Sequence, residues 1–198
     1  MSEAYPDVPG GVKIMAAIGH VCLQWARLEM ALLAVIYTIE GVPMEKGELI
    51  YGGLDIIPRV NMAVRLAEYH RLPQPLKKRL INARKQLQND LSERRNQIVH
   101  GAHRDADDDT TTLTMVRWRG EKRDKTFTAL DVHTVGTEIF ELANDLWLWI
   151  DDYGKWKFPG HGHENSFRDL IQAGPGPRLK GTKNLYTRIQ HLWRKLKG

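Results

Sequence analysis

The chain has 198 residues, of which 42% are hydrophobic and 27% are charged, a composition typical of a soluble globular protein. A single cysteine, Cys22, excludes an internal disulfide, and no Cys/His set has zinc-finger spacing, so we expect an intracellular, cytoplasmic protein with a reduced thiol. Residues 1–13 lack the basic and apolar regions of a secretion signal. The longest apolar stretches fall short of the ~20 residues that a bilayer span needs, so no membrane span is expected.

The formal net charge of +5 is unevenly distributed along the chain. Residues 178–198 carry seven Lys and Arg and no Asp or Glu, whereas the rest of the chain has 22 basic and 24 acidic residues. Such a block favours a polyanionic partner, an acidic protein surface or simple solvation, and the charge alone does not choose among them.

Three amphipathic helices are predicted in the first half of the chain. Apolar residues from Ile14 to Ile39 recur at spacings of three and four, which predicts one long helix that ends before Gly41 and Pro43. A second helix is predicted from Pro58 to about His70. A third runs from Pro75 to Gly101, and its apolar stripe is interrupted near Arg94 and Arg95. The stripe of this third helix consists of Leu76, Leu80, Ala83, Leu87, Leu91 and Ile98.

The second half of the chain adds a hairpin and a fourth helix. Residues 110–118 and 125–130, on either side of Gly120, are rich in Thr, Val, Trp and Phe and predict a β-hairpin. Asp131 is the expected N-cap of a helix whose stripe continues to Trp149. We therefore predict an all-α fold: an antiparallel, up-down four-helix bundle over 11–153 with the hairpin inserted at about 110–130. Residues 154–181 are predicted to be a Gly/Pro-rich linker, and residues 182–198 a basic amphipathic helix.

One short cluster remains as a candidate site, because no nucleotide-binding glycine loop, serine-hydrolase elbow or His-Glu-x-x-His motif is found. The third helix ends in Arg95, Asn96 and, four residues after Asn96, His100. At this place in a four-helix domain, the cluster resembles the Arg-x4-6-His motif of the HEPN superfamily. The resemblance covers about 11–153 and says nothing about 154–198.

The resemblance implies a metal-independent endoribonuclease that needs no cofactor and acts as a homodimer, with motifs from both subunits facing one cleft. An imidazole titrates near neutral pH, so His100 would be the general acid or base that acts on the ribose 2′-OH or the 5′-oxygen. Arg95 would neutralise the phosphorane and Asn96 would position either group. The products would be a 2′,3′-cyclic phosphate and a 5′-OH, and DNA should resist because it has no 2′-OH.

Helix geometry opposes this arrangement, because positions 95 and 100 lie about 140° apart on an ideal helix. Gly101 in a left-handed conformation would let His100 sit in a frayed last turn, and the long Arg95 side chain could reach around the helix. A two-fold interface would relax the demand further. The alternative is that these basic residues only complement the helix macrodipole at its C-terminal end.

Further residues are candidates for substrate contacts or for other roles. The candidates for RNA contacts are Lys85, Arg94, Arg104, Arg117 and Trp118. Metal binding by His161, His163 and Glu164, or by His100, His103, Asp105 and Asp107, is the less favoured interpretation of those groups. Trp25, Trp147 and Trp149 are expected in the core or in a dimer interface.

The biological setting is left open by the sequence. HEPN toxins of one subgroup carry a tyrosine two residues after the motif histidine, where an antitoxin modifies them, and this chain has Ala102 there. The resemblance implies a toxin or phage-defence effector with an antitoxin or regulatory partner. The alternative is a non-catalytic helical module that dimerises and binds RNA or protein. The basic helix at 182–198 could grip phosphates, lie on an anionic membrane or dock on protein.

Overall fold

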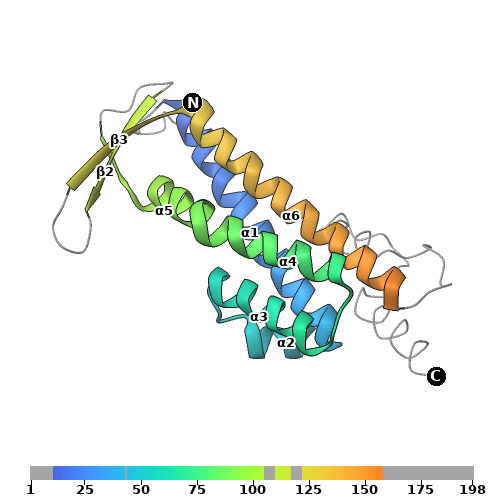
Figure 1. Cartoon of the computed structure of the whole chain (residues 1–198). Coiled ribbons are helices and arrows are strands. Elements are labelled where there is room, and N and C mark those ends of the chain that lie inside the picture. Colours follow the sequence, from blue (N-terminus) through green and yellow to red (C-terminus); the bar gives the residue numbers. More distant parts are fainter. Residues whose placement is uncertain (1–10, 43, 105–109, 117–121, 158–198) are drawn as a thin grey trace, which may run out of the picture. The chain divides into compact units, whose positions relative to one another are not determined.

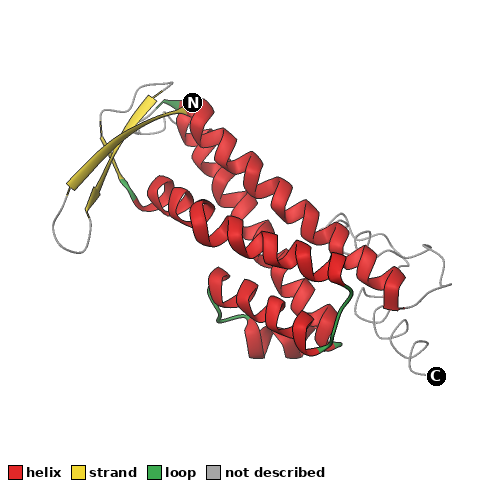
Figure 2. Ribbon diagram, viewed as in Figure 1, coloured by secondary structure: helices red, strands yellow, loops and turns green. Residues whose placement is uncertain are grey.

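The computed structural model describes residues 11–42, 44–104, 110–116 and 122–157. This part of the chain is mostly helical, as Figures 1 and 2 show, and the all-α prediction is confirmed at that level. The chain divides into two compact units, Met1–Ile150 and Asp151–Gly198. The first four residues of the predicted linker 154–181 are helical instead, because the last helix continues to Lys157. The rest of that linker and the basic C-terminal helix lie outside the described residues.

Helix α1 spans Val12–Glu40 and provides one side of the core. Its buried residues follow the predicted stripe, with Val21, Leu28 and Leu32 fully buried. The helix ends at Gly41, which adopts the left-handed conformation (φ 65°) and donates its N–H to the carbonyl oxygen of Tyr37. Because a residue without Cβ adopts this conformation at little cost, Gly41 stops the helix as predicted.

By length and composition alone, α1 could also cross a membrane. An 18-residue window within it has a mean hydropathy of 1.3, and 61% of that window is buried within the protein. The core helix of a globular domain passes the same test, so this apolar character does not decide between the two settings. The lack of a long uninterrupted apolar run in the sequence therefore does not by itself exclude a membrane span.

Helix α2, Met44–Tyr51, is absent from the sequence-based prediction. It is short and contains Gly47, so it has neither the length nor the repeating stripe that marks a helix. Its stability comes from packing on α1: a Cβ at Gly47 would overlap the Tyr37 ring, and the Tyr37 hydroxyl donates to Glu48 Oε2 at 3.2 Å. Burial and the Glu48 carboxylate raise the pKa of Tyr37 to about 12.

Helix α3, Ile56–Tyr69, runs in the same direction as α1. Arg59 near its start lies 4.0 Å from Glu29, and His70 just after its end lies 3.2 Å from Glu40. Both pairs are separated by the same number of residues, which requires parallel helices. The short helix α2 makes this possible because it returns the chain along α1 before α3 begins (Figure 1).

The predicted third helix is a helical run in three parts: α4 (Gln74–Gln86), the π-helical turn η1 (Leu87–Leu91) and α5 (Ser92–His100). Pro75 lies in the first turn of α4, as expected. A π turn inserts residues into the helical repeat and so rotates everything that follows it. This rotation accounts for the break in the apolar stripe near Arg94 and Arg95.

Three antiparallel strands follow α5: β1 (Ala102–Arg104), β2 (Thr110–Val116) and β3 (Lys122–Thr128), in the order β1-β2-β3. The sequence indicated β2 and β3 but missed β1, which is too short to show a pattern. Thr110 pairs with Thr128 and Val116 with Lys122. Gly101, which connects α5 to β1, is extended (φ −67°, ψ 144°) and not left-handed, so the expected cap is wrong.

Helix α6, Ala129–Lys157, begins with a capping box. Thr128, not Asp131, is the N-cap: its Oγ1 accepts from the Asp131 N–H at 3.0 Å, and Asp131 Oδ2 accepts from the Thr128 N–H at 2.9 Å. Hydrogen bonds from the Thr128 backbone and side chain hold the pKa of Asp131 below its usual value. The predicted cap is therefore displaced by three residues.

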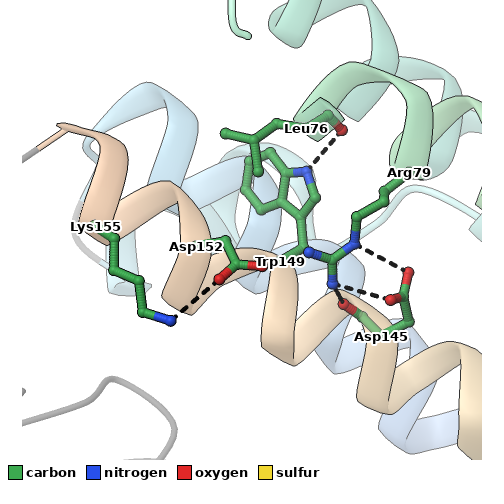
Figure 3. A network of polar contacts seen from close by, with 6 residues as sticks. All are labelled: Leu76, Arg79, Asp145, Trp149, Asp152 and Lys155. Atoms are coloured by element: carbon green, nitrogen blue, oxygen red, sulfur yellow. Dashed lines mark hydrogen bonds and ion pairs between the residues drawn. The ribbon is translucent and has the colours of Figure 1, made fainter. Parts of the chain in front are cut away.

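Helix α6 packs on both α1 and α4. Arg79 of α4 binds Asp145 through the carboxylate (NH2 to Oδ1, 2.9 Å) and the main-chain oxygen, while the buried Trp149 donates Nε1–H to the carbonyl oxygen of Leu76 at 2.9 Å (Figure 3). These pairs run antiparallel. The bonds explain why Trp149 is a core residue, as expected.

On its other side, α6 runs parallel to α1. The rings of His20 and His133 stack with centroids 4.8 Å apart. Seven residues further along both helices, about two turns, the Arg27 guanidinium lies over the Phe140 ring. Helices α1, α3 and α6 therefore share one direction and the α4–α5 run opposes them. This differs from the predicted up-down alternation, because the unforeseen α2 adds one more reversal of the chain.

In the second unit, the described residues are 151–157, the last turns of α6. Lys155 Nζ lies 3.2 Å from Asp152 Oδ1 (Figure 3), and Lys157 Nζ donates to the Tyr153 hydroxyl at 2.9 Å. Both are local contacts between residues one helical turn apart.

Candidate active site

The three residues of the candidate motif lie together at the end of α5. Arg95 NH1 is 3.1 Å from His100 Nε2 and donates to Asn96 Oδ1 at 2.9 Å. His100 and Asn96 are exposed to solvent, while Arg95 is half-buried. The cluster therefore presents an imidazole, a guanidinium and an amide at one surface.

The length of the Arg95 side chain resolves the helical-geometry difficulty. His100 is the last residue of α5, and the guanidinium reaches around the helix to it although the two Cα positions face different directions. A guanidinium can only donate hydrogen bonds, so His100 Nε2 accepts and its proton is on Nδ1. In this contact the Nε2 lone pair is directed at the Arg95 guanidinium.

The Trp25 ring of α1 lies against the Arg95 guanidinium. Arg95 Cζ lies 5.0 Å from the centre of the Trp25 ring, and Trp25 itself is buried. The Trp25 indole Nε1–H donates to Glu29 Oε1 at 3.1 Å, and Glu29 lies 4.0 Å from Arg59 of α3. The guanidinium is therefore placed by residues from two other helices.

The sequence placed Trp25 in the core or in a dimer interface, and the structure buries it in the core, but the sequence did not link it to Arg95. The available signal was the pairing of Trp25 with Glu29 one turn later on the same helix. That pattern identifies an oriented indole, but it does not reveal which residue rests on its face, because Arg95 comes from a distant segment.

A hollow of about 520 Å³ lies next to the cluster. We call it the α5 hollow; among the residues that line it are Ile57, Leu87, Ser92, Asn96, Gln97 and His100. Leu87 belongs to the π turn and Ile57 to the start of α3, and together they supply apolar surface. Because Asn96 and His100 belong to both the cluster and the hollow, a ligand in the hollow would contact the motif.

Arg94, proposed as a substrate contact, instead binds two carboxylates in the structure. Its NH1 lies 2.8 Å from Asp90 Oδ2 and 2.7 Å from Glu138 Oε2, and its NH2 donates to Glu138 Oε1 at 3.3 Å. Desolvation lowers the Arg94 pKa, but the bonds to Asp90 and Glu138 outweigh it and raise the pKa overall. Arg94 therefore ties α5 to α6 and could bind a phosphate only by giving up these partners.

Lys85 lies on a different part of the surface. It is exposed and lines a second hollow together with Asp90, Glu138, Glu141 and Asp145. We call this the acidic hollow. A surface with four carboxylates repels phosphates, so the structure does not support Lys85 as a substrate contact.

The remaining candidates lie at the edge of the described structure or beyond it. Arg104 is the last residue of β1, where only its backbone is described, paired with Thr112. Arg117, Trp118 and the His161, His163 and Glu164 group lie outside the described residues, as do Asp105 and Asp107. Within the described ranges, no three His, Cys, Asp or Glu side chains are grouped as metal ligands.

Comparison of the chain with protein-family models, with curated proteins and with solved structures finds no match.

Proposed function

We propose that the protein is a HEPN-like, metal-independent endoribonuclease with a helical-bundle domain. The observation that carries the proposal is the 3.1 Å contact between Arg95 NH1 and His100 Nε2 at an exposed helix end. Residues that serve only the helix macrodipole have no need to touch each other. Their approach, with Asn96 on the same guanidinium nitrogen, favours a shared ligand.

In the proposed reaction, a phosphate of the RNA chain displaces the Arg95–His100 contact. Arg95 then donates to the phosphorane oxygens, and Nε2 of His100, freed from the guanidinium, takes the proton of the 2′-OH. The P–O5′ bond breaks as the P–O2′ bond forms, which leaves a 2′,3′-cyclic phosphate and, after protonation, a 5′-OH. Asn96 positions the guanidinium or the imidazole.

A homodimer is part of this proposal, since the protonation of the 5′-oxygen calls for a second acid. His100 of a second subunit is the candidate for that group. The setting of a toxin or phage-defence effector with an antitoxin or regulatory partner is proposed from the family resemblance alone.

The charge of the α4–α5 run supports a nucleic-acid substrate. Residues 74–100 carry seven Lys and Arg and only two Asp and Glu. Three of the seven, Arg79, Lys85 and Arg94, lie among carboxylates of α6, so the support comes from the other four: Lys77, Lys78, Arg84 and Arg95. A basic helix favours a polyanion through counterion release, so RNA binding is expected to weaken steeply with salt.

The decisive experiment is an RNA cleavage assay in EDTA with the purified chain and the variants His100→Ala and Arg95→Ala. Wild type should cleave RNA but not DNA, and each substitution should lower the rate about 10²–10⁴-fold, the usual contribution of a general acid or base. His70→Ala, which removes an exposed histidine at the end of α3, is the matched control and should keep full activity. Equal cleavage by all four proteins would reject the proposal.

A second candidate function is a non-catalytic dimerisation and binding module, and one observation favours it. Helix α1 exposes four large apolar side chains along one side: Val12, Met15, Leu23 and Met30. Exposed apolar side chains of α6 include Phe140 and Leu148. Apolar patches of this kind commonly mark protein interfaces. If Leu23→Glu turns a dimer into a monomer in light scattering while no RNA is cleaved by wild type, this second function is the better one.

A further inference from the structure

Helices α3 and α4 lie side by side next to the α5 hollow and run in opposite directions. Gln88, in the π turn that continues α4, donates its Nε2–H to Asn61 Oδ1 of α3 at 3.3 Å. Gln88 also lines the α5 hollow, together with Asn96 and His100. The line of contact between the two helices, which we call the α3–α4 seam, therefore reaches the hollow that the candidate motif borders.

Two arginines occupy the next turn of this seam. Arg65 comes four residues after Asn61 on α3, and Arg84 comes four residues before Gln88 on α4. Residues four apart share one face of a helix, and because α3 and α4 are antiparallel, both steps lead to the same level of the seam. Arg65 is exposed and Arg84 is half-buried. The fold therefore gathers two guanidinium groups on one stretch of surface.

The charge of these arginines is not balanced by ion pairs. Within the described residues, neither Arg65 nor Arg84 forms a salt bridge; the arginines that do are Arg59, Arg79 and Arg94. Helix α4 contains no Asp or Glu, and α3 contains only Glu68, which lies one turn beyond Arg65 on the side away from the hollow. A cluster of one sign of charge attracts ligands of the opposite sign.

The distance between the arginines and the motif suits a strand of several nucleotides. At 1.5 Å per residue, Arg84 lies about 18 Å from Asn96 along the helical run. A stacked strand with a phosphate about every 3.4 Å covers this length with about five nucleotides. Guanidinium groups recognise phosphates with a planar fork of donors, so the arginines fit the backbone of such a strand.

The hollow between the two ends suits bases better than phosphates. Ile57 and Leu87 provide apolar surface there. Glu93 also lines the hollow, and its Oε1 accepts from Gln97 Nε2 at 3.1 Å. Because a carboxylate repels a phosphate, the backbone contacts are expected at the arginines and at the motif, with bases over the hollow.

We infer that Arg65 and Arg84 form a phosphate-binding pair for the part of a single RNA strand that flanks the scissile phosphate. The strand runs from the motif over the α5 hollow to the α3–α4 seam. The choice of RNA over an acidic protein segment rests on the proposed nuclease function, because the seam leads to the motif. Binding and cleavage are nevertheless separate measurements, so each is tested alone.

The test uses RNA that the protein cannot cleave. The affinity of the full chain for a 2′-fluoro uridine decamer, which lacks the 2′-OH, is measured by fluorescence anisotropy between about 50 and 200 mM salt. Each phosphate contact to a single strand adds about 0.7 to the slope of log K against log salt. Arg65→Gln and Arg84→Gln should each lower the slope by about 0.7 and weaken binding about fivefold at 0.1 M salt, and the double variant should lower the slope by about 1.4.

Two further variants separate the local effect from a change in overall charge or in folding. Lys85→Gln is the matched control, because it removes one positive charge from the acidic hollow and should leave the slope unchanged. Arg84→Lys keeps the charge and should keep the slope. Each slope is compared with that of wild type, so that phosphate contacts elsewhere on the chain cancel, and melting temperatures are measured in parallel.

Slopes at the wild-type value in both glutamine variants would overturn the arginine pair, and so would an equal loss in Lys85→Gln. A deca-glutamate peptide that binds as tightly as the RNA and is lost in the same variants would assign the pair to an acidic protein segment instead. Each of these results leaves the cleavage assay in EDTA untouched. Conversely, lowered slopes in a protein that cleaves no RNA would support the pair and reject only the nuclease function.

Discussion

Arg94 and Arg95 are neighbours in the sequence, yet they belong to two different regions of the molecule. Arg94 faces α6, where Asp90 and Glu138 surround its guanidinium with carboxylates. Arg95 faces α1, where it lies over the Trp25 ring and reaches His100 without a carboxylate in an ion pair with it within the described residues. Carboxylates balance the charge of Arg94, whereas the charge of Arg95 has no carboxylate partner among the described residues.

The contrast shows that the position in the helix does not decide the role of a basic residue. Both arginines lie in the first half of α5, five and six residues before its last residue. The facing helix makes the difference: α6 supplies Glu138, and α1 supplies an aromatic face that orients a guanidinium without quenching its charge. Function is therefore expected on the α1 side and stability on the α6 side.

The largest expected effect is a loss of RNA cleavage in Arg95→Lys, compared with Arg94→Lys. Arg95→Lys loses the planar fork that touches Asn96 and His100 together, so we expect RNA cleavage to fall about 100-fold, the scale of one lost electrostatic contact. Arg94→Lys keeps a cation near Glu138 and should change the cleavage rate less than twofold. Rates from a fluorescent RNA substrate, measured with melting temperatures, check both expectations.

A comparable loss of cleavage in both lysine variants would break the comparison between the two sides of α5. It would mean that the charge of the helix end as a whole supports activity, and that the Trp25 side has no special role.

The next effect concerns Trp25 as a positioning residue. Trp25→Leu removes the ring below Arg95, and we expect kcat to fall about tenfold, because a cation–π contact contributes about 0.5–2 kcal/mol. KM should change little, since other groups bind the RNA chain. Trp25→Phe restores a ring and should recover most of kcat, even though it loses the bond to Glu29.

A purely structural role for Trp25 predicts another pattern. Both variants would then lose stability and activity in proportion, and phenylalanine would not rescue kcat selectively. Steady-state kinetics at a temperature well below both melting transitions separates the two cases.

A smaller effect is expected for stability on the α6 side. Arg94→Ala leaves Glu138 without its partner and should lower the free energy of unfolding by about 1 kcal/mol, the upper end for partly exposed ion pairs. Arg95→Ala should cost about 0.5–1 kcal/mol, because among the described residues it loses the contact with the Trp25 ring but no ion pair. Urea denaturation of the two variants gives both values, and a larger loss for Arg95→Ala would contradict the assignment.

The sequence predicted the long helices well, because their stripes repeat over many turns. Val21, Leu28 and Leu32 lie where the pattern places them, and Gly41 ends α1 as its chemistry requires. The sequence did not predict α2, because the helix depends on the close packing of Gly47 on Tyr37. No local pattern reveals such a contact between segments.

The candidate site was predictable in part. Arg95, Asn96 and His100 were picked from their spacing and the motif resemblance, and the reach of the Arg95 side chain was one of the expected means of contact. The other expected means, a left-handed Gly101, is wrong. The roles of Arg94 and Lys85 were missed for a common reason: Glu138, Glu141 and Asp145 come from α6, far along the chain. Which charges meet across helices is a property of packing.

The smallest effect tests the direct contact between α1 and α6, the two helices that flank α5. Desolvation, the neighbouring His133 and Arg27 together lower the pKa of His20 below its usual 6.5. The unfolded chain therefore takes up a proton at a higher pH than the folded chain, so stability is greatest above about pH 6.5 and falls as the pH drops through that value. A positive charge on His20 would also face the stacked ring of His133.

His20→Gln removes this titration, so the loss of unfolding free energy between pH 7 and pH 5 should be smaller in the variant than in wild type. His70→Gln, in the exposed pair with Glu40, serves as the control for removing a histidine elsewhere. The low pKa of Asp131 affects all three proteins alike, because its bonds to Thr128 are lost only at more acidic pH. An unchanged slope in His20→Gln would show that the α1–α6 contact is indifferent to the protonation of His20.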